Sequence, residues 1–138
     1  MQPNSVPSVA IVRHLEASDW QKTRSFSPAV ITEGGRIVWL AGQTTLTDLE
    51  GNDITGRFEE QARTVLALID RTLHKAGGSL ANLVTTTVFI NDPRNGDRFV
   101  EIRGEYFKDS CCPGSALVTV SNFARAGCVI EIQGIAVI

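Results

Sequence analysis

The sequence has no long hydrophobic run and no excess of basic residues, and these absences exclude several classes of protein. Its apolar runs extend over only a few residues, as at positions 37–41, which is too short to cross a membrane. The net charge is −2, so the chain lacks the basic surface that drives sequence-independent binding to nucleic acid. We therefore expect neither a membrane nor a nucleic acid as a partner.

Cysteines are few, and their number does not suit a disulfide framework. There are three, an odd number, and residues 1–7 show neither the cationic start nor the apolar stretch of an export signal. We therefore expect reduced cysteines in a cytoplasmic protein, with Cys128 packed as a small hydrophobic residue. Cys111 and Cys112 could form a reactive pair, but the sequence shows no helix N-terminus or histidine partner beside them.

The two histidines stand apart from clusters of acidic residues, so the sequence predicts no metal site. His74 follows Asp70 by four residues on an expected helix, a spacing typical of a surface pair. His14 lies in the first 25 residues, which are weakly patterned and could hold one irregular strand. The whole chain of 138 residues is of a size and composition that predict one globular domain, residues 1–138.

Hydrophobic periodicity predicts five strands and two helices after this first segment. The expected strands cover residues 29–32, 36–41, 83–90, 113–120 and 128–138, and the expected helices cover residues 58–76 and 97–108. Gly34 and Gly35 are a hairpin signal between the first two strands, because both tolerate positive φ. Asp97 is expected at or near the N-cap of the second helix.

The order β-β-α-β-α-β-β predicts an α+β fold in which two helices cover one face of a mixed sheet. The last strand is apolar or small on both of its faces, with Ile130 and Ile132 on one and Val129 and Ile135 on the other. Since the helices can cover only one face, we expect another copy of the chain to cover the other. The sequence thus predicts a homo-oligomer that packs sheet to sheet.

Glu131 is the one ionisable residue in this last apolar strand. A carboxylate there must be partnered, solvated in a cleft or kept protonated, because burying it alone is costly. It is therefore our main candidate for a catalytic group. A structural role, with Glu131 hydrogen-bonded across subunits, is the alternative.

Five short sequence segments, in their order and spacing, resemble the Rid family (YjgF, L-PSP-like proteins) over about residues 25–138. They are Ala-Gly-Gln at 41–43, Gln-Ala-Arg-Thr-Val-Leu at 61–66, Lys-Ala-Gly-Gly-Ser-Leu at 75–80, Thr-Thr-Val-Phe-Ile at 86–90 and Val-Ile-Glu-Ile-Gln-Gly-Ile-Ala-Val at 129–137. The resemblance implies a chorismate-mutase-like fold and a homotrimer with three clefts between subunits. It also implies hydrolysis of small enamines and imines to keto acids and ammonia, without metal or cofactor.

The resemblance further implies roles for particular residues. Glu131 occupies the position of the glutamate that positions water in deaminase members, and burial lets a carboxyl group hold or supply a proton near working pH. The backbone N–H groups of Gly42 and Leu117 lie where the family pocket uses main-chain donors. Gln43 follows on the same pocket strand. The expected partners are therefore further copies of the chain and a small-molecule substrate.

Three pocket positions depart from the family pattern. Where deaminase members have an arginine that grips the substrate carboxylate, this chain has Ser115, and serine cannot replace a fixed cation at a two-pronged contact. Ser115 is either a hydroxyl contact for the substrate or an ordinary residue at the start of a strand. Leu117 replaces the pocket cysteine, and Ala29 replaces an aromatic residue. Three other cations could reach the cleft: Arg24, Arg103 and Arg125.

Three classes of function remain open from the sequence. The first is a cofactor-free hydrolase of a small imine, enamine or related amine. The second is a non-catalytic binder of a small molecule in the same cleft, and the third is a holdase-like protein that uses exposed apolar surface. Some relatives carry ribonuclease labels, but the acidity of this chain makes that the least favoured function.

Overall fold

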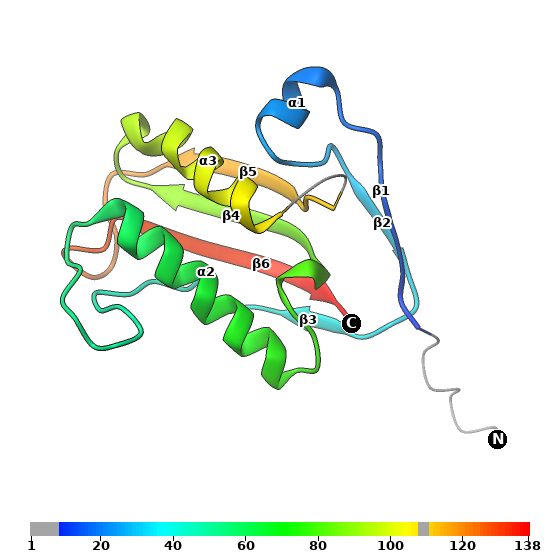
Figure 1. The fold of residues 1–138 in the computed structure, drawn as a ribbon, viewed down its shortest axis with the longest axis horizontal. Helices are drawn as coiled ribbons and strands as arrows, with labels where there is room; N and C mark the ends of the chain where they lie inside the picture. Colours follow the sequence, from blue (N-terminus) through cyan, green and yellow to red (C-terminus); the bar gives the residue numbers. More distant parts are fainter. Residues whose placement is uncertain (1–8, 108–110) are drawn as a thin grey trace.

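The computed structural model describes residues 9–107 and 111–138 as a four-stranded mixed sheet with two long helices and a separate two-stranded sheet (Figure 1). The elements in chain order are β1 (Ile11–His14), α1 (Asp19–Thr23), β2 (Val30–Glu33), β3 (Ile37–Trp39), α2 (Phe58–Lys75), the 3₁₀ turn η1 (Leu80–Asn82), β4 (Leu83–Ile90), the 3₁₀ turn η2 (Pro93–Asn95), α3 (Gly96–Tyr106), β5 (Gly114–Thr119) and β6 (Ile130–Val137).

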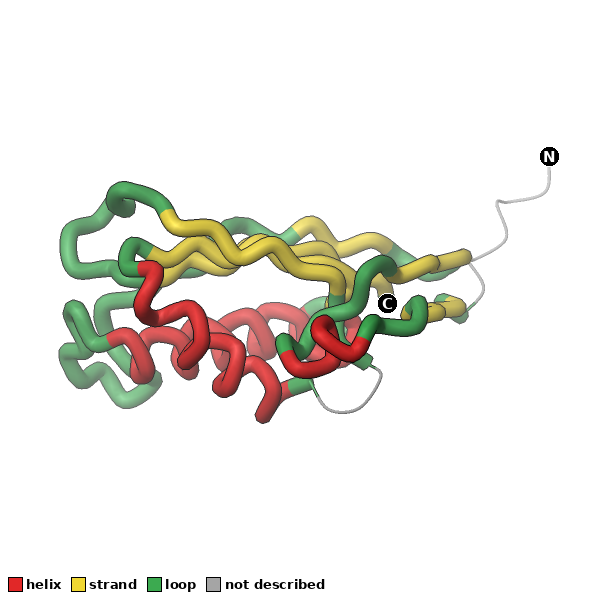
Figure 2. The backbone as a smooth tube through the Cα atoms, turned by 90° about the horizontal axis from the view of Figure 1, so that it is seen from above, coloured by secondary structure: helices red, strands yellow, loops and turns green. Residues whose placement is uncertain are grey.

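The four-stranded sheet has the order β3-β6-β4-β5. β6 pairs antiparallel with both β3 and β4, whereas β5 pairs parallel with β4. Helices α2 and α3 both lie on one side of this sheet (Figure 2). The predicted α+β arrangement is thus confirmed. Inside the first 25 residues, β1 corresponds to the one strand that this segment could hold, and α1 is an additional element.

Helix α2 forms because its apolar residues recur every three or four positions and make a single stripe. Ala62, Val65, Ile69 and Leu73 of this stripe are buried against the sheet. The helix reaches Lys75, just before the glycine pair at 77–78, as predicted. None of the described helices has the length and apolar content that a membrane span requires.

Helix α3 begins slightly earlier than the sequence indicates. Its N-cap is Asn95, which makes no side-chain capping bond, and Asp97 lies in the first turn rather than at the cap. Phe99 and Ile102 are buried against the sheet. The predicted end at residue 108 lies outside the described residues.

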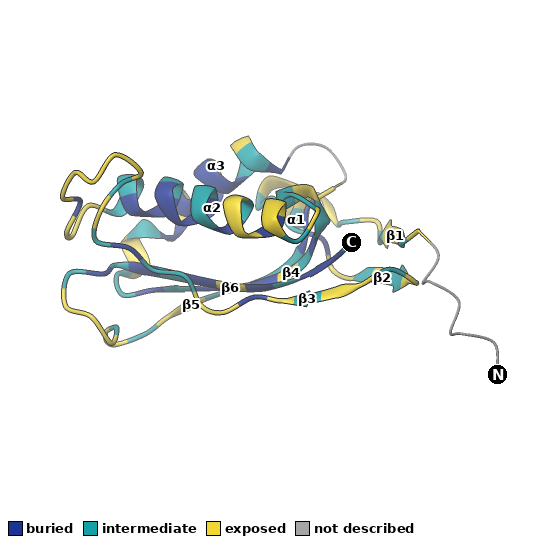
Figure 3. Cartoon of the chain, turned by 90° about the horizontal axis from the view of Figure 1, so that it is seen from below, coloured by how far each residue is buried: buried dark blue, intermediate teal, exposed yellow. Residues whose placement is uncertain are grey.

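The core lies between the two helices and the sheet face that they cover. On the sheet side it is built from alternate residues of the two central strands, Val88 and Ile90 of β4 with Ile130 and Ile132 of β6, all at most 1% exposed. Figure 3 shows this layer as the buried part of the molecule. The register of β6 in the sheet follows from this alternation, because a slip by one residue would move Glu131 into the core.

The predicted hairpin between the first two strands is wrong. Gly34 and Gly35 do adopt positive φ, at 68° and 76°, but β2 pairs with β1 while β3 pairs with β6. Gly35 lies where the chain passes from one sheet to the other: a Cβ there would approach Ile138 O to 2.9 Å. The glycine pair therefore serves a crossing between sheets, which the local sequence pattern does not distinguish from a hairpin.

The sheet face opposite α2 and α3 carries no other element of the described chain. We call this the open face. It consists of the side chains of Ile37, Trp39, Thr85, Thr87, Phe89, Ala116, Val118, Glu131, Gln133 and Ile135. Trp39 is 73% exposed and Ile37 is 57% exposed, an unusual position for large apolar groups. This is the face that we expect further copies of the chain to cover.

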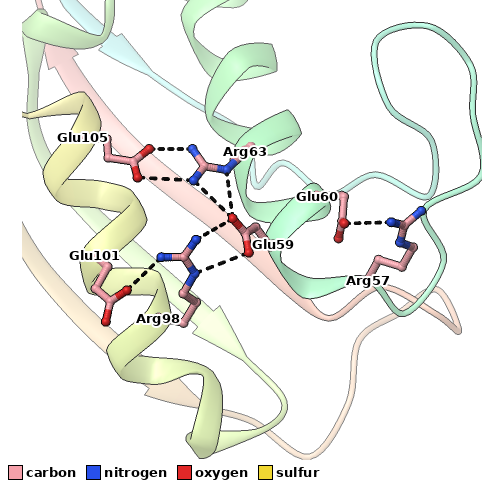
Figure 4. A network of polar contacts seen from close by, with 7 residues as sticks. All are labelled: Arg57, Glu59, Glu60, Arg63, Arg98, Glu101 and Glu105. Carbon is pink, nitrogen blue, oxygen red and sulfur yellow. Dashed lines mark hydrogen bonds and ion pairs between the residues drawn. The ribbon is translucent and has the colours of Figure 1, made fainter.

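Charged side chains join α2 to α3 on the surface of the helical layer (Figure 4). Glu59 of α2 contacts Arg98 of α3, and Arg63 of α2 contacts Glu105 of α3 at 2.6 Å. The hydrogen bond from Arg98, followed by that from Arg63, lowers the pKa of Glu59 below its usual value. The network thus links α3 to α2 at the surface, while the buried residues Phe99 and Ile102 pack α3 against the sheet.

This network predicts a specific loss of stability in acid. The pKa of Glu59 is lowered in the folded state, so the ionised carboxylate stabilises the fold. This stabilisation is fully present above the pKa of the unfolded chain, near 4.5, and is lost as the pH falls through the lower pKa of the folded state. In Glu59→Gln the fall in the urea midpoint between pH 7 and acid should be smaller than in the unmodified protein. Equal falls in the two proteins would show that the ion pairs of Glu59 contribute nothing to stability.

Candidate functional site

Glu131 lies on β6, opposite Phe89 of β4, and its side chain is on the open face. Its neighbours in sequence, Ile130 and Ile132, are buried in the core, so alternation along the strand places the carboxylate on the other side. The residue is partly exposed, and no described residue hydrogen-bonds to its carboxylate. Glu131 is therefore held by the strand while its oxygens remain available to another group.

Gly42 and Gln43 lie beside Glu131 in the structure. Gln43 N donates to Ile132 O at 2.9 Å, and Ile132 N donates to Gln43 O at 3.2 Å. A Cβ at Gly42 would come within 3.0 Å of the Glu131 Cδ and 3.1 Å of its Oε2. A side chain at position 42 would therefore force the carboxylate to move from this position by a few tenths of an ångström. Arg125 is close to this group, since its Nη2 donates to Thr44 Oγ1 at 3.1 Å.

Ser115 and Leu117 lie on the other side of the sheet. Leu117 packs against the core, and the Ser115 hydroxyl accepts hydrogen bonds from Arg103 of α3 and from Thr86 of β4. β5, which carries both residues, is the edge strand and is separated from β6 by β4. One chain therefore does not bring Ser115 and Glu131 into a common cavity. It presents two groups of predicted site residues, one on each face.

Arg103 is the residue that the structure adds to the second group. Its Nη1 donates to Ser115 Oγ at 2.7 Å and its Nη2 donates to the Arg24 carbonyl at 2.6 Å. Burial lowers the pKa of Arg103 to about 10, so it still carries its charge at neutral pH. Of the three candidate arginines, Arg103 is the one that contacts the predicted site residue Ser115. The sequence does contain a sign that Arg103 is buried: it lies four residues from both Phe99 and Phe107, in line with the apolar side of its helix.

A cavity of about 280 Å³ adjoins Arg103 and Ser115. Its other walls are formed by the first helical segment, α3 and β5, through Trp20, Arg24, Phe26, Val100 and Leu117. Trp20 and Phe26 meet edge to face, with ring centroids 5.9 Å apart. The cavity is therefore largely apolar, with a guanidinium and a hydroxyl at one end.

Other candidates from the sequence do not form a site of comparable character. A larger cavity of about 630 Å³ lies beneath the N-terminal segment, but none of the predicted site residues lines it. Cys111 is exposed and Cys112 is buried, and burial raises the pKa of the Cys112 thiol, which opposes thiolate formation. His74 pairs with Asp70 at 3.4 Å, the predicted surface pair. Cys128 is buried as expected.

Residues that could bind a metal ion do not gather in the described part of the chain. No group of three or more histidine, cysteine, aspartate or glutamate side chains there could hold one.

Gln61 of α2 fixes the start of the strand that carries Glu131. It is fully buried, its Nε2 donates to Ile54 O and Gly127 O, and its Oε1 accepts from Val129 N at 2.9 Å. All its polar atoms are thus used to hold two loops against the end of the helix. The position of Glu131 along the sheet depends on this buried anchor.

Comparison with known proteins assigns this fold and sequence to a family of small proteins. The family model described as endoribonuclease L-PSP matches residues 17–138. A RutC family protein of Pyrococcus horikoshii is 32% identical over 75% of this chain and 81% of its own, and the human 2-iminobutanoate/2-iminopropanoate deaminase is 30% identical over 81% and 79%. The Rid-family protein YyfB of Yersinia pestis superposes with a TM-score of 0.80 at 23% identity, over 94% of this chain and 98% of that one, which shows a shared fold.

Replacing Gln61 tests whether its hydrogen bonds hold the start of β6. In Gln61→Met the side-chain volume is kept, and the carbonyls of Ile54 and Gly127 keep backbone partners, but Val129 N is left unpaired. We expect the free energy of unfolding to fall by about 2 kcal/mol, measured by urea denaturation. An unchanged free energy would show that water replaces this anchor without cost.

Proposed function

The chain belongs to the Rid family, also described as the endoribonuclease L-PSP family, and we propose that it is a hydrolase that deaminates a small imine or enamine. The names of its relatives support this class of reaction, among them the human deaminase. The observation that carries the proposal is the Glu131 carboxylate, an ionisable group that lies on an otherwise largely apolar sheet face and for which Gly42 leaves room.

The chemistry requires an activated water and the movement of protons. Water adds to the carbon of the C=N bond, and the nitrogen takes up a proton. The resulting carbinolamine then loses ammonia, and its C–N electrons leave with the nitrogen as the carbonyl forms. Glu131 can accept the proton of the attacking water and return it to the departing nitrogen. Because an imine carbon is already electrophilic, we propose that the reaction needs no metal or cofactor.

We propose that the complete site forms between copies of the chain, as a homotrimer would provide. Within one chain the Glu131 carboxylate and the Arg103–Ser115 cavity are on opposite faces of the sheet. The exposed Trp39, Ile37 and Val118 give the open face the apolar character of an interface. Contact of one copy's open face with the β5 edge of the next would bring the two groups together.

Glu131→Gln tests the catalytic role. The amide keeps the shape but cannot accept a proton, so the rate of ammonia release from 2-aminoacrylate and from larger enamines should fall about 100-fold or more. Gly42→Ala is the matched variant, because its Cβ displaces the intact carboxylate. It should lower the rate in the same direction.

A Glu131→Gln protein as active as the unmodified protein would remove Glu131 from the mechanism. Activity absent in both, on every imine and enamine tried, would instead favour the non-catalytic binder.

Trp39→Asp tests the shared site. Trp39 is 73% exposed in the single chain. It pairs with Ile135 of β6, four residues along the strand from Glu131, so its replacement leaves the immediate surroundings of Glu131 unchanged. A charge there should abolish association, as measured by sedimentation, and abolish deamination with it, although Glu131 is intact. Sedimentation of the unmodified protein as a monomer at micromolar concentration, or full activity of a monomeric Trp39→Asp protein, would contradict a site made by two copies.

A further inference from the structure

We propose that Arg103 is the group that binds the carboxylate of an acidic substrate in this protein. The identity of the reaction rests on the proposed function, but binding of a carboxylate to Arg103 does not depend on turnover. The argument comes from three observations: a buried charge without a counter-ion, donors left over at one point, and a cavity of suitable size beside them.

Arg103 is buried and unpaired by any carboxylate of the described chain. It is 3% exposed, and it takes part in none of the ion pairs among the described residues. The ring of Phe99, whose centroid lies 5.2 Å from Cζ, also faces the guanidinium, but it carries no net charge. An uncompensated buried charge destabilises a fold, so this position is suited to a group that arrives from outside with the opposite charge.

Two hydrogen-bond donors beside the cavity have no acceptor among the described residues: Arg103 Nε and the Ser115 hydroxyl. The acceptors of Arg103 are both neutral, namely Ser115 Oγ and the Arg24 carbonyl, and its buried Nε has no partner among the described residues. Ser115 Oγ accepts from both Arg103 and Thr86, so its own proton is left to donate. A guanidinium and a hydroxyl side by side match the two oxygens of a carboxylate.

The adjoining cavity gives the ligand its size and polarity. At about 280 Å³ it holds a small organic acid, and its walls of Trp20, Phe26, Val100 and Leu117 suit a short aliphatic chain. Ser115 is small enough to let a guanidinium reach this end of the cavity from α3. The cation that deaminase relatives carry on the strand is thus supplied here by the helix.

The two other arginines are less suited to this role. Arg24 lines the same cavity, but its guanidinium pairs with Asp97 at 2.8 Å. Arg125 is exposed and lies near Thr44, on the side of Glu131. Both serve as comparison variants, because each would lose carboxylate binding if it were the true anchor.

The test is calorimetric titration of the unmodified protein, Arg103→Met, Arg103→Lys, Arg24→Met, Arg125→Met and the surface control Arg71→Met. The ligands are 2-oxobutanoate and its uncharged amide. We expect the acid to bind more tightly than the amide, with this preference lost in Arg103→Met and the affinity for the acid reduced about 10-fold or more. Arg103→Lys should restore little of it, and Arg71→Met should bind as the unmodified protein does.

Three results would overturn the proposal: no preference for the acid in the unmodified protein, full preference in Arg103→Met, or its loss in Arg125→Met or Arg24→Met alone. The first of these needs no variant, so it remains decisive if Arg103→Met does not fold. Glu131→Gln separates this inference from the proposed function. It should bind the acid normally while failing to release ammonia, so loss of turnover with retained binding leaves Arg103 assigned.

Discussion

Both long helices pack on the same face of the four-stranded sheet, and this one-sided packing determines where each part of the site lies. Apolar residues of β4 and β6 face the helices, so the alternate residues, Glu131 among them, must face the other way. A carboxylate in β6 is tolerated because its side of the strand is not core. The same arrangement leaves Trp39 and Ile37 exposed, so the structural feature that frees Glu131 also creates the surface on which we propose that copies associate.

The two halves of the proposed site have opposite electrostatic character. On the open face, an acidic group has no hydrogen-bond partner among the described residues; on the covered face, near the β5 edge, the buried cation Arg103 has no carboxylate partner. Each is unsatisfied within one chain, and each suits a different part of one small molecule: the carboxylate for Arg103, the C=N carbon and its water for Glu131. Under this proposal, substrate binding supplies the counter-charge for Arg103, and chain association brings Glu131 to the bound substrate.

Periodicity and resemblance predict most of the fold, and the structure places Gly42 and Gln43, two of the proposed site residues, beside Glu131. The long strand at 83–90 and the helix from residue 58 are confirmed because their patterns reflect burial, which the sheet and helices then provide. The hairpin at Gly34 and Gly35 could not be judged locally, since pairing partners are decided by β1 and by the C-terminal strand. The resemblance implies that Ser115 and Glu131 face one cavity between subunits of a trimer. Within one chain, alternation along β5 directs Ser115 toward α3 and away from Glu131. Arg103 was only one of three possible cations, because its distance to Ser115 depends on how α3 packs across the sheet.

The most direct test of a site shared by two copies is to combine two inactive variants. Glu131→Gln and Arg103→Met are unfolded together, refolded as a mixture and assayed for ammonia release at low substrate concentration, beside each variant refolded alone. If Glu131 of one copy acts on a substrate held by Arg103 of the next, random mixing creates about a quarter of intact sites, and activity returns in that proportion. A mixture that forms mixed oligomers but stays as inactive as its components would contradict a site divided between chains.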